Sequence, residues 1–233
     1  MAQRIAIDSK SARTHRPMES KRAEQQRAQE TRSAILDAAL AEFASKRFDA
    51  ASIRGIADRI GLQHPLITYH FRTKEILWRA VAEYVFERVR RERDSYLTDL
   101  GSVSALDRVK LAYRALFRFT VDYPELHRFM LQETLGYSPR LQWIADTILK
   151  PLIDWLLPQI RAAQDEQALP KVEPIIFHYM LISLTSTLSG FGPEISATSN
   201  LSPSDPALAD AYWRTVEQLV FETLPAFGAL ASV

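Results

Sequence analysis

The 233-residue chain contains no cysteine. It therefore has no disulfide framework, no thiolate nucleophile and no Cys-based zinc site. No apolar run approaches the roughly 18 residues that a bilayer-crossing helix needs. The N-terminus is polar and charged, without the apolar centre of a signal peptide. We therefore expect no membrane partner and a cytoplasmic location.

Glycine is scarce as well, with 7 residues, while 47% of the chain is hydrophobic without strand-like alternating runs. This combination predicts an all-α fold. A chain of this length forms one large domain or two small ones, with room for a substantial core.

Patterns typical of catalysis and metal binding are missing. The histidines are scattered, at His15, His64, His70, His127 and His178. There is no HExxH spacing and no Gly-rich phosphate loop. We therefore expect neither an enzyme, nor a metal site, nor a cofactor.

The stretch 52–71, SIRGIADRIGLQHPLITYHF, predicts two short helices joined by a tight turn. Its first half has apolar residues at the helical spacing i, i+3, i+4 and i+7: Ile53, Ile56, Ala57 and Ile60. Ser52 stands where an N-cap should, and Gly61 where a left-handed residue would end the helix. Pro65 is tolerated only in the first turn of the second helix, which places Ile67 and Phe71 on its buried side.

The second helix then leaves a nearly uncharged set of side chains facing outward: Gln63, His64, Leu66, Thr68, Tyr69 and His70. Amides, imidazoles, hydroxyls and methyl-rich groups pair with or pack against base edges in a major groove. The stretch is therefore interpreted as a helix-turn-helix reader of DNA. An ordinary helical hairpin inside an all-α domain is the alternative.

Residues 32–81 resemble the DNA-binding domain of the tetracycline-repressor (TetR) family of bacterial transcription regulators. The residues that carry the match are Ile35, Leu36, Ala38, Ala39, Phe43, Phe48, 51–57, Gly61, Leu62, 69–71, Lys74, Glu75 and Leu77. The chain departs from the family at Arg47, where Gly is common, and at Thr68, where Tyr is usual. The resemblance implies a DNA-binding regulator with a base or phosphate contact at Arg54. With the outward set it gives the expected DNA-binding residues: Ser52, Arg54, Gln63, His64, Pro65, Leu66, Thr68, Tyr69, His70 and Lys74.

Charge is distributed unevenly. Residues 1–74 hold 14 Lys and Arg against 8 Asp and Glu, whereas the remainder holds 15 against 20. Phosphate neutralisation predicts a basic surface around a DNA reader. We expect a flexible basic arm over 1–27, whose Lys21, Arg22 and Arg27 add nonspecific affinity. Residues 19–32 are rich in helix formers, and a solvated backward extension of the first helix is the alternative for them. A tail that is basic without any DNA role is the alternative.

The expected organisation is a three-helix DNA-binding domain over 28–76, with the helix-turn-helix at 52–71, and a larger helical effector-binding and dimerisation domain over 77–233. Beyond the reader we expect helices at 73–98, 104–122, 125–135, 140–164, 172–189 and 205–224. Pro151 and Pro158 should kink or split the fourth of these. Residues 190–206 should form a loop.

Helix 172–189 is apolar on more than one side. Most of its surface must therefore be covered by other helices. In the resembled family, two C-terminal helices pair across a two-fold axis. We therefore expect a homodimer through about 172–189 and 205–224. Two readers related in this way address a palindromic operator in double-stranded DNA.

Aromatic, sulfur-bearing and imidazole side chains on the middle helices suggest a cavity for a small-molecule effector. The residues proposed to line it are Tyr113, Phe117, His127, Phe129, Met130, Trp143, Phe177, His178 and Met180. Plain core packing is the alternative for each of them. Two functional hypotheses follow: a nucleoid-associated repressor released by a small apolar ligand, and a constitutive DNA-binding protein of the same fold that answers to a protein partner or organises the chromosome.

Overall fold

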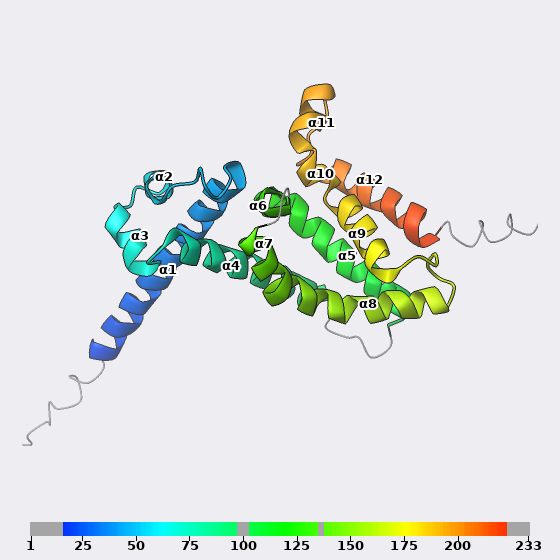
Figure 1. Ribbon diagram of the computed structural model, residues 1–233, viewed down its shortest axis with the longest axis horizontal. Coiled ribbons are helices and arrows are strands. Elements are labelled where there is room, and N and C mark those ends of the chain that lie inside the picture. The colour runs from blue at the N-terminus through cyan, green and yellow to red at the C-terminus, as the bar shows by residue number, and fades with distance from the viewer. Residues whose placement is uncertain (1–15, 97–102, 135–137, 223–233) are drawn as a thin grey trace, which may run out of the picture.

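The computed structural model describes residues 16–96, 103–134 and 138–222, and this part of the chain contains helices and no strand (Figure 1). Figure 1 shows an elongated molecule with the short helices α2 and α3 near one end and α12 toward the other. The all-α prediction is confirmed. None of the described helices is both long and apolar enough to cross a membrane.

The N-terminal part consists of α1 (Arg16–Ser45), α2 (Ile53–Arg59), α3 (His64–His70) and the long α4 (Lys74–Tyr96). Ala, Glu, Gln and Arg dominate the first half of α1, and these residues favour helix even where nothing packs on them. Residues 21–30 are all exposed. Residues 16–27, expected as a flexible arm, are therefore helical, and residues 1–15 lie outside the described residues.

The four N-terminal helices bury one apolar stripe each. Leu36 of α1, Ile56 of α2, Ile67 of α3 and Leu77 of α4 are at most 1% exposed. Burying such side chains stabilises the fold by about 1.5–3 kcal/mol each. This common core fixes the orientation of α3, although α3 is too short to be stable alone.

The C-terminal part begins at α5 (Ala105–Asp122) and α6 (Pro124–Thr134), followed by α7 (Pro139–Ile144) and a π-helical segment η1 (Ala145–Leu149). It continues through α8 (Lys150–Asp165), α9 (Pro174–Thr185), α10 (Thr187–Gly190), α11 (Gly192–Thr198), α12 (Pro206–Glu217) and η2 (Gln218–Glu222). At Pro151 the expected kink or split of helix 140–164 takes the form of the π-helical segment η1, whereas α8 continues through Pro158 without a break. Pro151 has no N–H for a helical hydrogen bond, and the backbone widens in the turn before it.

Two expected segments differ. Helix 172–189 is two helices, because Thr185 and Ser186 both donate their hydroxyl to the Ile182 carbonyl at 3.1 and 2.6 Å and so compete with the helical ladder. The expected loop 190–206 contains α11, in which Pro193 occupies the first turn, a position that favours helix. Figure 1 shows α11 standing out from the body of the molecule.

The helical body packs directly on the N-terminal core. Trp78 of α4 lies 5.4 Å from Phe129 of α6 and 6.1 Å from Trp143 of α7, measured between ring centroids. Phe129 is 1% exposed and belongs to the same apolar cluster as the N-terminal helices. Helices α4 and α6 therefore connect the body to the helices that carry the reader.

Candidate DNA-reading face and ligand cavity

Local hydrogen bonds set the boundaries of α2. The Ser52 hydroxyl accepts the Gly55 N–H at 2.9 Å, which confirms the predicted N-cap. At the other end Gly61 has φ +63°, and the Leu62 N–H donates to the Ala57 carbonyl at 3.1 Å. This is the left-handed ending that glycine makes without strain. The turn that aims α3 is thus specified by two residues.

Gly55 also lets α2 approach α1 closely. A Cβ at this position would lie 2.8 Å from Glu42 Oε1. Glu42 is 1% exposed and pairs with Lys46 at 2.7 Å and Arg59 at 3.0 Å. Burial acts to raise the pKa of Glu42, but the hydrogen bonds from Lys46 and Arg59 outweigh burial and lower it. A charged carboxylate therefore fixes α2 against α1.

Helix α3 buries Ile67 and Phe71 and turns its other residues outward, as predicted. Tyr69 is 81% exposed and Leu66 36%. Gln63, His64 and Pro65 are exposed at the leading end, while Thr68 and His70 are half-buried. The Thr68 hydroxyl donates to the Pro65 carbonyl at 3.0 Å. The outward face of the helix is therefore polar and nearly uncharged, and its buried face is apolar.

Positive charge flanks this surface. Arg54 is exposed on the first turn of α2, and Lys21, Arg22 and Arg27 are exposed on the free half of α1. Exposed basic side chains on the helices next to α3 suit contact with the phosphate backbones that border a major groove.

Lys74, at the start of α4, is hydrogen-bonded to the turn before α2. Its ammonium donates to the carbonyls of Phe48 at 2.8 Å, Ala51 at 3.0 Å and Asp49 at 3.3 Å. It also lies 4.5 Å from the centroid of the Phe48 ring. All three of its donor hydrogens have backbone partners in the turn before α2. Lys74, expected among the DNA-binding residues, thus directs its donor hydrogens at the protein's own backbone.

A cavity of about 420 Å³ lies between α4, α5, α6, α8 and α9. Four of the residues predicted to line it do so: Tyr113, His127, Met130 and His178. They come from α5, α6 and α9.

The remaining five predicted pocket residues do not line the cavity. Phe117 stacks on Trp213 and Tyr212 with centroids 5.3 and 5.6 Å apart, and Phe177 is buried in the same apolar cluster. Phe129 and Trp143 pack on Trp78 instead. Met180 is 52% exposed on the outer face of α9. Their side chains leave the helices on faces that point away from the cavity.

Sequence reasoning missed much of the lining. Leu152 and Trp155 enter from α8, Ile182 and Thr185 from α9, and Phe86 from α4. Ile182 lies four residues after His178, so helical periodicity from a known pocket residue would have found it. The residues of α4 and α8 carry no comparable signal, because only tertiary packing brings these helices to the cavity.

The polar side chains of the cavity include one buried phenol and two partly buried imidazoles. The Tyr113 hydroxyl lies 2.7 Å from His178 Nδ1, and His127 Nδ1 lies 3.3 Å from the Ser189 hydroxyl. Burial lowers the pKa of His178 to about 4 and lowers that of His127, and it raises the pKa of Tyr113. A Cβ at Gly190 would lie 2.6 Å from His127 Cε1, so glycine there makes room for the imidazole.

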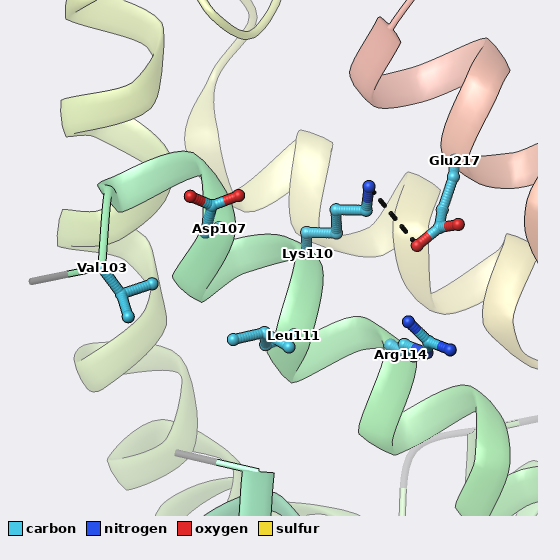
Figure 2. Close-up of a pocket in the computed structure, with 6 residues that line it drawn as sticks. All are labelled: Val103, Asp107, Lys110, Leu111, Arg114 and Glu217. Carbon is cyan, nitrogen blue, oxygen red and sulfur yellow. Dashed lines mark ion pairs between the residues drawn. The ribbon is translucent and has the colours of Figure 1, made fainter. Parts of the chain in front are cut away.

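A second hollow lies on the surface beside α5 and α12 (Figure 2). Figure 2 shows Lys110 reaching from α5 toward Glu217, and these two side chains form an ion pair at 3.5 Å. Asp107 and Arg114 also border this hollow, and Arg114 is exposed. Lys110 and Glu217 are half-buried and neutralise each other, so the charged border of this hollow offers little binding energy to an apolar ligand.

Over residues 16–96, 103–134 and 138–222 there is no cluster of three or more His, Asp or Glu side chains suited to a metal ion.

The chain resembles known regulators in sequence. Residues 35–81 match the model of the bacterial regulatory proteins of the tetR family. The HTH-type transcriptional regulator RutR of Escherichia coli K12 is 24% identical over 191 residues, which span 82% of this chain and 89% of RutR.

Solved structures share the fold. A bacterial regulatory protein in the tetR family from Rhodococcus RHA1 superposes with a TM-score of 0.63 at 22% identity, over 82% of this chain and 96% of that one. AibR in complex with isovaleryl coenzyme A and operator DNA superposes with a TM-score of 0.67 at 14% identity, over 82% of this chain and 98% of AibR. At such identities the likeness concerns the fold alone.

Proposed function

We propose that this transcriptional regulator, which belongs to the tetR family of bacterial regulatory proteins, is a cytoplasmic repressor that binds a palindromic operator as a homodimer and is released by a small apolar ligand. The observation that carries the proposal is the outer face of α3. Tyr69 is 81% exposed there beside other uncharged polar groups, while Ile67 and Phe71 anchor the helix from behind. A surface of this composition suits base edges better than bulk solvent.

Within this proposal, 28–76 serves as the DNA-binding domain and 77–233 as the effector-binding and dimerisation domain. Gln63, His64, Pro65, Leu66, Thr68, Tyr69 and His70 contact bases or the groove wall. Ser52 orients α2, and Arg54 contacts a base or a phosphate. Lys74 supports the reader by holding the carbonyls of the preceding turn, and its contribution to DNA affinity is indirect.

Exposed apolar side chains on α9 support the dimer. Ile176, Tyr179 and Met180 are 52%, 50% and 52% exposed, at the spacing i, i+3 and i+4 that forms one helical stripe. Leu219, just beyond α12, is 64% exposed. An apolar stripe of this kind is typical of an interface between copies of a chain. A dimer through α9 and α12 would place two copies of α3 on one side of DNA.

The position of the cavity supports ligand control. Helix α6 contributes His127 and Met130 to the cavity and Phe129 to the contact with Trp78. Helix α4 contributes Phe86 to the cavity and Leu77 to the core beneath the reader. A ligand that binds more tightly to one arrangement of α4 and α6 must favour that arrangement, by its differential affinity and no more. The formed cavity favours this mechanism over a constitutive DNA-binding protein.

AibR, which has this fold, binds both isovaleryl coenzyme A and operator DNA. This supports a chain of this architecture acting on DNA and a small molecule together.

The proposal is tested by incubating the purified full-length protein with genomic fragments and sequencing those it retains. We expect a palindromic consensus, with half-sites about 34–36 Å apart. Small molecules are then screened for release of one retained fragment. Retention without any sequence preference over random competitor DNA would refute the reading function. A preference that no small molecule changes would refute ligand control and favour the constitutive alternative.

A further inference from the structure

The wall of the cavity carries no formally charged residue type. None of its 21 described lining residues is Asp, Glu, Lys or Arg, although these four types make up 24% of the chain. Leu116, Leu149, Leu152 and Ile153 are typical of the lining. A cavity without ionic partners cannot offset the loss of water around a charged group.

Most hydroxyls in the wall are already hydrogen-bonded to the backbone. The Thr120 hydroxyl bonds to the Thr185 carbonyl at 2.8 Å, and the hydroxyls of Thr185 and Ser186 bond to the Ile182 carbonyl. The Thr134 hydroxyl bonds to the Leu131 carbonyl at 3.2 Å. Their hydrogens are therefore not directed at a ligand.

The Tyr113–His178 pair is the closest polar contact in the wall that a ligand can address, and the His127 imidazole and the Tyr179 side chain also line the cavity. The two polar atoms of the pair lie 2.7 Å apart and share one hydrogen. If the phenol donates to Nδ1, the ring keeps an N–H at Nε2 and the phenol oxygen keeps a lone pair. If the ring donates, the phenol keeps its O–H and Nε2 its lone pair. In either tautomer one donor and one acceptor remain, which matches a neutral hydroxyl or carbonyl group.

The titratable side chains of this site are also uncharged near pH 7. Burial lowers the pKa of His178 to about 4 and depresses that of His127, so both imidazoles are neutral near pH 7. Burial raises the pKa of Tyr113, which keeps its phenol protonated. An entering carboxylate would find no cation, and an entering ammonium would find no anion.

We infer that the cavity selects an uncharged, largely apolar molecule with a hydroxyl or carbonyl group that meets the Tyr113–His178 pair, and that it rejects acids and amines of the same shape. The volume of about 420 Å³ lies toward the lower end of the ~300–1,000 Å³ typical of ligand sites, which limits the molecule to a small one. The inference names the ligand class of the proposed repressor and so rests on that proposed function.

A pair of fluorescent dyes tests the charge preference directly. N-phenylnaphthylamine is uncharged near neutral pH, and anilinonaphthalene sulfonate has the same ring skeleton with one sulfonate added. Titrated into the full-length protein at pH 7, the uncharged dye should saturate at about one molecule per chain and bind at least ~10-fold more tightly. Equal or tighter binding of the sulfonate, or no saturable binding of the uncharged dye, would overturn the inference.

A lysine introduced into the cavity wall tests whether the dyes bind inside the cavity. Met130→Lys replaces one flexible cavity side chain by a cation and should strengthen sulfonate binding by at least ~10-fold while weakening the uncharged dye. Leu131→Lys is the matched control, because Leu131 is 38% exposed on the outer side of the same helix and does not line the cavity. Equal gains in both variants would place the dyes on the surface and contradict the inference. The wild-type comparison decides the charge preference even where Met130→Lys does not fold.

The same samples separate this inference from the repressor proposal. The retained operator fragment is titrated with and without the uncharged dye and its hydroxyl-bearing analogues. Selective cavity binding in a protein that shows no DNA preference would support the ligand class and refute the repressor. Operator binding together with equal affinity for both dyes would support the repressor and refute the ligand class.

Discussion

The guanidinium of Arg140 lies over the ring of Phe48, with its central carbon 3.9 Å from the ring centroid. Arg140 belongs to α7 in the helical body, and Phe48 lies in the turn just before the reader. Lys74 lies 4.5 Å from the centroid of the same ring. Glu133, 4% exposed on α6, pairs with Arg140 at 3.1 Å. The ion pair between the half-buried Arg140 and the buried Glu133 of α6 is thus in contact with the turn that leads into α2.

Arg140→Ala should lower the free energy of unfolding by about 3 kcal/mol, because it leaves the buried Glu133 carboxylate with the Ser138 hydroxyl in place of a cation. Urea denaturation followed by circular dichroism measures the change. The double variant Arg140→Gln with Glu133→Gln removes both charges and should recover part of the loss. A loss below about 0.5 kcal/mol for Arg140→Ala would show that the pair is not buried in solution.

Lys74→Ala should destabilise the N-terminal helices by about 1–3 kcal/mol, because three backbone carbonyls lose a charged donor. The DNA affinity of the variant should fall because its N-terminal helices are less stable. Lowering the temperature should therefore restore part of the binding. Lys74→Arg is the comparison variant. A variant as stable as the wild type that still loses DNA binding would instead indicate a direct phosphate contact.

Tyr69→Ala should weaken operator binding by about 1–3 kcal/mol and alter the preferred sequence, because it removes the most exposed aromatic group of α3. Its stability should change by less than about 0.5 kcal/mol. Selection from a randomised DNA library, compared with the wild type, reports the change in preference. An unchanged consensus at unchanged affinity would remove Tyr69 from the reading face.

Arg54→Ala should weaken binding to DNA with little loss of stability, since the Arg54 side chain is exposed. The salt dependence distinguishes its two expected roles. A phosphate contact predicts uniform weakening across sequences and a salt slope reduced by about one, whereas a base contact predicts a relaxed preference at one position. Fluorescence anisotropy at several salt concentrations provides the measurement.

Stability should fall as the pH is lowered from about 6.5 toward 4. Burial lowers the pKa of His178 to about 4 and lowers that of His127, whereas imidazoles in an unfolded chain titrate near ~6.5. The unfolded state therefore binds more protons in this window, and the stability present above it is lost as the pH falls. His178→Gln should reduce the slope of stability against pH by up to about one proton. An unchanged slope would show that His178 is solvated.

The sequence by itself determined the helical fold and the reader. Apolar spacing set the buried faces of α2 and α3, and Ser52 and Gly61 set the ends of α2, because caps and periodicity act between residues a few positions apart. Pro151 determined in the same local way where the long helix divides.

Tertiary structure decided which residues serve the cavity and what Lys74 does. Phe117, Phe129 and Phe177 have the same chemistry as true lining residues, and only the packing of α5, α6 and α9 turns them toward the core. The partners of Lys74 are carbonyls 23–26 positions away in the sequence. Contacts over such distances depend on how helices pack, which local patterns of residues do not encode.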